Sequence, residues 1–176
     1  GKFELAAALS FSGDQEIYLL TGTGKIIKRI TRMKGSDISP SWSPDGKKIA
    51  FVSTRSGNPQ IYIKDLVTEK VRRLTYKGNY NTQPSWSPLG DKVIYSSLVD
   101  GRHNIFVIDV EGFEPLQLTH ESGDNEAPSW SPDGSMIAFS SNREGPFRIY
   151  VMTAFGTDQR RLLMMKGEQT NPKWSM

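Results

Sequence analysis

Pro40-Ser41-Trp42-Ser43-Pro44-Asp45-Gly46 decides the fold, because the chain repeats this stretch at a fixed spacing. It returns at 84–90, with Leu89 in place of the aspartate, and again at 128–134. The tryptophans are 44 residues apart, at Trp42, Trp86, Trp130 and Trp174. Self-similarity at a fixed period of about 20–50 residues is typical of repeat architectures. The 176 residues therefore correspond to four repeats.

One repeat divides into four short strands. In the second copy, residues 41–43 predict an inner strand, and Pro44-Asp45-Gly46 predicts the turn that follows it, since Pro and Gly suit turn geometry. Residues 48–52 form a β-branched and aromatic run that predicts a second strand. Residues 60–66 predict a third strand, and 71–75, which is more polar, predicts the outermost one. Four antiparallel strands in about 40–50 residues are typical of a propeller blade.

We therefore predict an all-β protein, a single β-propeller domain over residues 1–176 with four blades, each a four-stranded antiparallel sheet. The chain begins in a second strand, at 5–9, and ends after a first strand, at 173–175. We expect this C-terminal inner strand to pair with the N-terminal blade, which would close the ring without an open sheet edge. Closure would give a monomer; without it, chains would associate into a larger ring.

The composition excludes several classes of site. The chain has no cysteine, which rules out zinc–thiolate sites, disulfides and a cysteine nucleophile. Its net charge is +3, and no run of Lys or Arg forms a nucleic-acid patch. No stretch approaches the roughly 20 apolar residues of a membrane span. Residues 1–5 do not resemble a signal peptide, although a processed exported chain would look the same.

Binding is expected where the copies differ, since loops on a rigid scaffold carry function. The axial loops join an outer strand to the next inner strand, at 34–39, 78–83, 122–127 and 166–171. The outer loops join second and third strands, at 11–14, 55–58, 100–103 and 143–146. Alternating strand direction predicts that both sets share one face. The alternative is that they are solvated turns. We predict partner contacts by Asp37, Arg55, Tyr80, Asn81, Thr82, Arg102, Asp124, Asn125, Glu126, Arg143, Glu168, Gln169 and Thr170.

No motif predicts catalysis. His103 and His120 are the two candidate bases at neutral pH, and neither belongs to a nucleophile elbow. The glycine-containing segment 21–25 lies in a predicted hairpin with no helix after it, unlike a phosphate loop. Four acidic residues are expected near the channel and could pair as acid and base or hold a calcium ion: Asp37, Asp124, Glu126 and Glu168. Since no motif supports either role, we predict no enzyme, no cofactor and no metal.

The repeat closely resembles that of TolB-type β-propellers. The resemblance rests on residues 40–53, followed by Gln60-Ile61-Tyr62-Ile63 and Arg72-Arg73-Leu74-Thr75, and it extends over essentially the whole chain. It implies a non-catalytic periplasmic scaffold of the Tol–Pal cell-envelope system, which binds the peptidoglycan-associated lipoprotein across one face. By loop position, it implies contacts at Tyr80, Asn81, Thr82, Asp124, Asn125 and Glu126.

The chain also departs from this family. TolB-like proteins have six blades and an N-terminal α/β domain, whereas this chain has four repeats and corresponds to the C-terminal four. A fragment cut at repeat boundaries would explain the difference. Two other interpretations stay open: an accessory gating propeller of a prolyl-oligopeptidase-like peptidase, and an engineered propeller fragment that retains no partner.

Overall fold

The computed structural model describes residues 4–11, 13–120 and 123–174, which form fifteen strands and no helix. The first sheet has the order β1-β2-β3, with β1 (Glu4–Leu9), β2 (Glu16–Thr21) and β3 (Ile26–Arg29). The second contains β4 (Asp37–Trp42), β5 (Lys48–Ser53), β6 (Gln60–Asp65) and β7 (Val71–Arg73). The third contains β8 (Asn81–Trp86), β9 (Lys92–Val99), β10 (Arg102–Asp109) and β11 (Leu116–Gln117). The fourth contains β12 (Asn125–Trp130), β13 (Met136–Ser141), β14 (Arg148–Thr153) and β15 (Arg160–Arg161).

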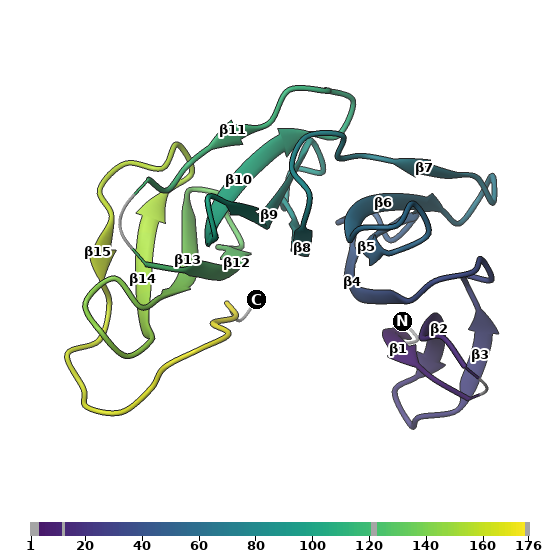
Figure 1. Cartoon of the computed structure of the whole chain (residues 1–176). Coiled ribbons are helices and arrows are strands. Elements are labelled where there is room, and N and C mark those ends of the chain that lie inside the picture. The colour runs from purple at the N-terminus through teal and green to yellow at the C-terminus, as the bar shows by residue number, and fades with distance from the viewer. Residues whose placement is uncertain (1–3, 12, 121–122, 175–176) are drawn as a thin grey trace.

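The four sheets follow one another around an arc (Figure 1). Strands β4, β8 and β12 lie on its concave side, and β3, β7, β11 and β15 lie outermost. Every recorded strand pairing is antiparallel, as between β5 and β6, where Phe51 lies opposite Tyr62. The prediction of an all-β chain built from repeated antiparallel sheets is therefore confirmed.

The structure does not show the predicted closure of the ring. The first sheet has three strands, and residues 170–174 form no strand, while residue 175 lies outside the described part. The C-terminal segment instead follows the fourth sheet: the Gln169 N–H donates to Phe147 O at 2.9 Å, and Trp174 Nε1 donates to Ser129 O at 3.2 Å. Both contacts join the C-terminal segment to the fourth repeat. The first sheet, by contrast, lies across the opening of the arc (Figure 1).

The core consists of three apolar clusters, each between two adjacent sheets. Trp86 is buried between the second and third sheets and Trp130 between the third and fourth, while Trp42 packs partly buried between the first and second. Trp174 is 40% exposed. The first three repeated tryptophans therefore fill the space between adjacent sheets.

Glu69 joins the outer parts of the first two sheets. Lys28 Nζ of β3 lies 2.6 Å from its Oε1, and Lys64 Nζ of β6 lies 2.7 Å from its Oε2. The hydrogen bonds from these two ammonium groups lower the pKa of Glu69 to about 2. The carboxylate is solvent-exposed, so this contribution is screened by salt.

We expect Glu69→Gln to lower the melting temperature slightly at neutral pH and low salt. The pKa of Glu69 falls on folding from 4.5 to about 2, so its contribution is complete above the unfolded value and disappears as the pH falls toward the folded one. The difference in melting temperature between the parent and Glu69→Gln should therefore narrow below about pH 4.5 and at high salt. A difference that is independent of both pH and salt would contradict this prediction.

Candidate binding face of the axial loops

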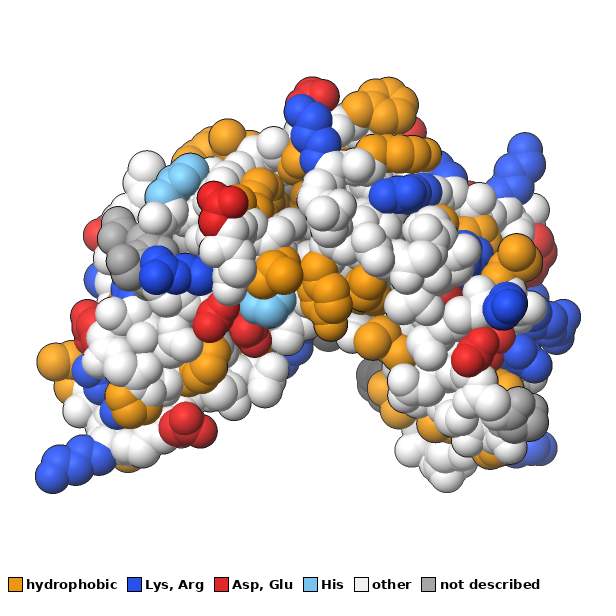
Figure 2. Space-filling view, in the orientation of Figure 1, with side chains coloured by type: hydrophobic (Ala, Val, Ile, Leu, Met, Phe, Trp, Pro, Cys, Tyr) orange, Lys and Arg blue, Asp and Glu red, His pale blue; other side chains and the backbone are white. Residues whose placement is uncertain are grey.

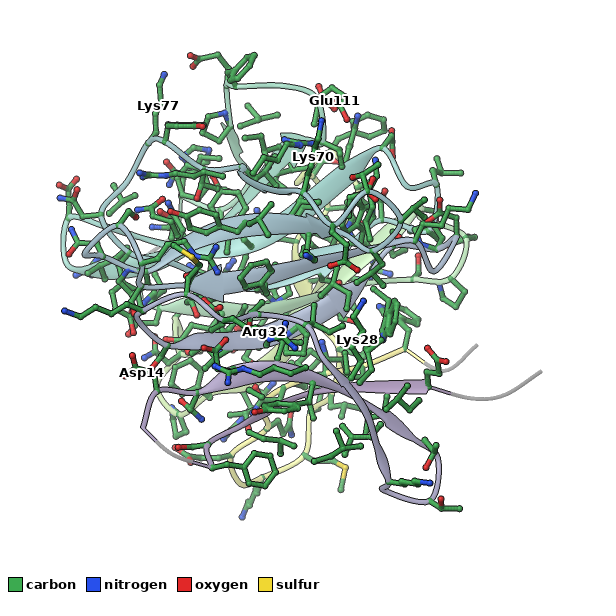
Figure 3. The ribbon with its side chains drawn as sticks, turned by 90° about the vertical axis from the view of Figure 1, so that its right-hand side faces the viewer. Asp14, Lys28, Arg32, Lys70, Lys77 and Glu111 are labelled. Atoms are coloured by element: carbon green, nitrogen blue, oxygen red, sulfur yellow. The ribbon has the colours of Figure 1, made fainter. Side chains whose placement is uncertain are left out.

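The axial and outer loops lie on the same face, as predicted. In the second repeat, the Ser36 N–H donates to Thr54 Oγ1 at 2.9 Å, and the Thr54 N–H donates to Ser36 O at 3.1 Å. In the fourth, the Asp124 N–H donates to Asn142 Oδ1 at 2.6 Å. In the side view of Figure 3, Asp14 and Lys77 lie toward the left of the sheets, and Lys70 and Glu111 lie to the right of them. Residues 12 and 122 of these loops lie outside the described part.

Each axial loop contains a residue in the left-handed region directly before the proline. The φ angles are 53° at Ser39, 53° at Gln83, 51° at Ala127 and 54° at Asn171. In β4, β8 and β12 the pairing register shifts around this residue, which marks a bulge that bends the strand. Gln83 Oε1 accepts a hydrogen bond from the Ala127 N–H at 2.9 Å and so links two consecutive loops. These two loops are thereby fixed relative to one another.

Two of the predicted contact residues form a buried ion pair. Asp37 begins β4 with its side chain 1% exposed, and Arg55 Nη2 lies 2.8 Å from its Oδ2. The Arg55 guanidinium also donates from Nε to Ser53 Oγ at 2.7 Å. It lies over the rings of Phe51 and Tyr62, at 5.3 and 4.9 Å from their centroids. These contacts give Asp37 and Arg55 an internal role, and their predicted contact with a partner stays a prediction.

The same repeat position carries an asparagine in the third and fourth sheets. Asn81 and Asn125 are both 0% exposed. Asn81 Nδ2 donates to Gln60 Oε1 at 2.8 Å, and Asn125 Oδ1 accepts from Arg143 Nη2 at 2.7 Å. The Arg143 guanidinium covers the rings of Phe139 and Tyr150, as Arg55 covers its two rings. Asn81, Asn125 and Arg143 therefore anchor the loops from below, and their predicted contact with a partner stays a prediction.

Gly123 lets the fourth repeat's axial loop approach its outer loop. Its φ is +90°, and an added Cβ would lie 2.5 Å from Asn142 Oδ1 and 2.9 Å from the Arg143 backbone. Gly145 has a φ of +115° but open space around the same added atom. An alanine at Gly145 would therefore meet backbone strain alone, whereas an alanine at Gly123 would meet both strain and steric overlap.

We expect Gly123→Ala to destabilise the protein more than Gly145→Ala does. The left-handed backbone costs an alanine about 1–2 kcal/mol at either position, and the overlap adds to that cost at Gly123 alone. Urea denaturation of the parent and the two variants measures both costs: Gly145→Ala gives that of the backbone, and the further loss in Gly123→Ala gives that of the overlap. Equal losses would show that the Gly123 loop moves aside without cost.

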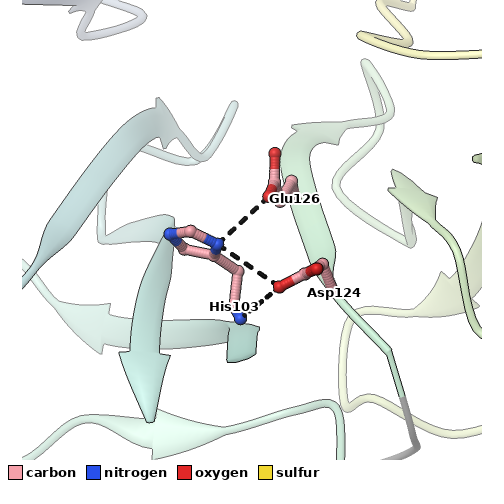
Figure 4. A group of neighbouring side chains, drawn as sticks. All are labelled: His103, Asp124 and Glu126. Carbon is pink, nitrogen blue, oxygen red and sulfur yellow. Dashed lines mark hydrogen bonds and ion pairs between the residues drawn. The ribbon is translucent and has the colours of Figure 1, made fainter. Parts of the chain in front are cut away.

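The surface part of the face is centred on His103, Asp124 and Glu126. His103 lies in β10 of the third sheet, Asp124 directly precedes β12 of the fourth, and Glu126 lies within β12. His103 Nδ1 is 3.1 Å from Glu126 Oε1 and 3.5 Å from Asp124 Oδ1 (Figure 4). Acidic side chains gather beside a histidine on this part of the surface (Figure 2). Tyr80, which is 43% exposed, contacts the His103 ring edge-on with a centroid distance of 5.9 Å.

The charges of this group favour an imidazolium between two carboxylates. The hydrogen bond to Glu126 raises the pKa of His103 against the opposing effect of burial, and the charges of Glu126 and Asp124 raise it further. Burial opposes ionisation of Asp124, but hydrogen bonds from the backbone N–H of His103 and from the Asn142 side chain outweigh this effect and lower the pKa of Asp124. At neutral pH the cluster is therefore net acidic.

The remaining predicted residues are spread over the face. Thr82 is half-buried, paired with Ser96 across β8 and β9. Arg102 and His120 line a pocket of about 330 Å³ on the third sheet. Glu168 and Thr170 are exposed, and Gln169 is half-buried. Among the described residues, the acidic groups expected to converge do so at Asp124 and Glu126, whereas Asp37 is buried with Arg55.

Sequence reasoning considered His103 only as a base and did not connect it to the carboxylates. The available signal was its place in an outer loop of the third repeat, next to the axial loop that enters the fourth. The corresponding positions in the other repeats are Gln15, Pro59 and Phe147. A position that differs in every copy is the kind at which function was expected.

Comparisons with known proteins agree with this architecture. The family model described as the TolB beta propeller domain matches residues 2–176. The Protein TolB homolog of Chlorobium chlorochromatii is 56% identical over 52 residues, 30% of this chain and 12% of that protein. The Tol-Pal system protein TolB of Desulfosudis oleivorans is 66% identical over 35 residues, 20% of this chain and 8% of that protein. The crystal structure of TolB from Acinetobacter baumannii has a TM-score of 0.86 at 31% identity, covering 98% of this chain and 43% of that one.

The chain thus covers less than half of the solved TolB, and the segment that matches the Chlorobium relative covers about an eighth of that protein's length. Among the residues that the structure describes, none forms a helix that could cross a membrane. The family model covers all four repeats, and the solved structure superposes on nearly the whole arc. The chain belongs to the TolB β-propeller domain family.

Proposed function

We propose that this chain is a non-catalytic protein-interaction scaffold of the Tol–Pal cell-envelope system, acting in the periplasm. Its partner is the peptidoglycan-associated lipoprotein, bound through the face that carries the axial loops. Family membership over residues 2–176 supports the scaffold role. The name of the Desulfosudis relative, a Tol-Pal system protein, supports the system.

The surface group of Tyr80, Asp124 and Glu126 carries the proposal. Tyr80 offers a large, partly exposed ring whose position is set by contact with His103, and exposed aromatic side chains of this kind often dominate binding energy. The two carboxylates beside it provide acceptors for the partner's hydrogen-bond donors and basic groups. The loops beneath are held by partly buried hydrogen bonds, so little ordering of the face is needed on binding.

Calorimetric titration of the full chain with the soluble domain of a peptidoglycan-associated lipoprotein tests the proposal. We expect saturable binding that Tyr80→Ala weakens by about tenfold or more, the effect of a hot-spot residue. Phe155→Ala is the matched control, because Phe155 is 84% exposed in the β14–β15 hairpin, on the opposite face. Its affinity should equal that of the parent.

Two outcomes would contradict this assignment. A folded chain that shows no saturable binding would separate the family's scaffold from the proposed partner. An equal loss of affinity in Tyr80→Ala and Phe155→Ala would show that the variants act through stability and that the axial loops are not the contact.

A further inference from the structure

We propose that His103, Asp124 and Glu126 form a binding site for a divalent transition-metal ion, and that zinc suits it best. The inference goes beyond the proposed scaffold role and does not depend on any protein partner. It also departs from the sequence-based expectation that the chain holds no metal. The three side chains come from two adjacent sheets and meet on the axial-loop face (Figure 4).

The spacing of the ligand atoms fits a metal centre. Each residue contributes one atom, and these atoms all lie within 4.8 Å of one another. His103 Nδ1 is 3.1 Å from the Glu126 oxygen and 3.5 Å from the Asp124 oxygen. Tetrahedral zinc with bonds of about 2.0–2.2 Å separates neighbouring ligand atoms by roughly 3.3–3.6 Å. An ion could therefore enter with small movements of the side chains.

The donor set selects among metals. One imidazole nitrogen and two carboxylate oxygens are ligands that zinc accepts, with a fourth position left for water. Calcium prefers six to eight oxygen ligands, and magnesium an octahedral shell with several waters. The imidazole therefore favours a transition metal over either ion. The three side chains are 23%, 32% and 30% exposed, so solvent can deliver the ion and supply that water.

The surrounding contacts hold the ligands in place. Asp124 Oδ1 accepts a hydrogen bond from the backbone N–H of His103 at 2.9 Å, and Asp124 Oδ2 accepts one from Asn142 Nδ2 at 3.3 Å. Tyr80 packs against the imidazole ring. Partners that orient metal ligands in this way commonly change metal affinity by about 10–100-fold when they are removed. The site is thus supported by the fold and does not rest on three mobile side chains.

The test is isothermal titration of the metal-free full chain with zinc chloride in a non-chelating buffer. We expect one ion per chain, with affinity lowered about tenfold or more by His103→Ala and by Glu126→Gln. The matched control is His120→Ala, which removes the other histidine, exposed and outside the cluster, and should bind zinc as the parent does. Circular dichroism of each variant establishes that it is folded.

Several results would overturn the site or its ion. Absence of saturable zinc binding by the parent would leave the cluster as an ion pair between two sheets. Undiminished binding in His103→Ala, or loss in His120→Ala, would place the ion elsewhere. Calcium binding as tight as that of zinc would contradict the choice of metal. Because no protein partner is present, these outcomes are separate from those that test the scaffold role.

Discussion

Replacing Phe139 with alanine is expected to lower the free energy of unfolding by about 3–5 kcal/mol. Phe139 is 0% exposed and belongs to the cluster between the third and fourth sheets. Its ring lies 5.8 Å from that of Tyr150, and the Arg143 guanidinium lies 5.4 Å from its centroid. The substitution removes apolar burial, leaves a cavity and takes away one of the two rings that support Arg143. Such a loss is a large share of the roughly 5–15 kcal/mol that stabilises a typical domain.

Phe155→Ala is the control for this prediction, since it removes the same side chain from a position that is 84% exposed. Denaturant unfolding should place it within about 0.5 kcal/mol of the parent. Because repeats contact mainly their neighbours, hydrogen exchange in Phe139→Ala should lose protection in the third and fourth sheets before the first. Equal losses for the two phenylalanines, or uniform loss of protection, would contradict the packing described above.

The repeat made the strands of the second sheet predictable within a few residues. The expected strands at 48–52 and 60–66 correspond to β5 (Lys48–Ser53) and β6 (Gln60–Asp65). The inner strand was expected at 41–43 but begins at Asp37. Residues 34–39 were expected to form an axial loop, and proline is unfavourable within a strand except at edges and bulges. The bulge between Ile38 and Ser41 accommodates the proline and lets the pairing continue on both sides.

The ring closure was not predictable in the same way. The C-terminal inner strand was expected to pair with the N-terminal blade. Whether it does so depends on the angle between successive sheets, which is set by packing in the clusters between them. No short motif reports that angle, and in the structure Trp174 contacts Ser129 of the preceding repeat.

The location of the face was predictable, but the exposure of individual residues within it was not. Asp37, Asn81 and Asn125 share one repeat position, and each is paired with a serine of the next strand. That recurrence marks a structural role, which the search for polar loop residues overlooked. Asp124 lies just one residue earlier and is half-buried, because it precedes the first paired position of β12.

Replacing Arg55 with alanine is expected to cost about 3–5 kcal/mol at neutral pH, because it leaves the Asp37 carboxylate buried without its partner. The Asp37 side chain is 1% exposed, and that of Arg55 is 13% exposed. Arg72→Ala is a suitable control, since the Arg72 side chain is 42% exposed and its ion pair with Glu111 lies at the surface. Denaturant unfolding should show a much smaller loss for that variant.

The cost of Arg55→Ala should depend on pH in an unusual direction. Burial raises the pKa of Asp37 above its ordinary 3.8, even though hydrogen bonds from Ser53 and the charge of Arg55 act to lower it. A carboxyl group whose folded pKa exceeds the unfolded value is destabilising when ionised, and this penalty disappears as the pH falls below both values. Removing Arg55 raises the folded pKa further. The stability gap between parent and variant should therefore narrow on acidification, and a constant gap would contradict this account.

Asp37→Asn separates the buried charge from the packing of the guanidinium. Asn125 already accepts from Arg143 at 2.7 Å in the fourth sheet, so an asparagine at position 37 can accept from Arg55 in the same way. The single variant should unfold within about 1 kcal/mol of the parent. The double variant, Asp37→Asn with Arg55→Ala, should recover most of the stability lost in Arg55→Ala, because no buried charge is left unpaired. If it is as unstable as Arg55→Ala alone, the loss arises from the guanidinium's contacts with Phe51 and Tyr62.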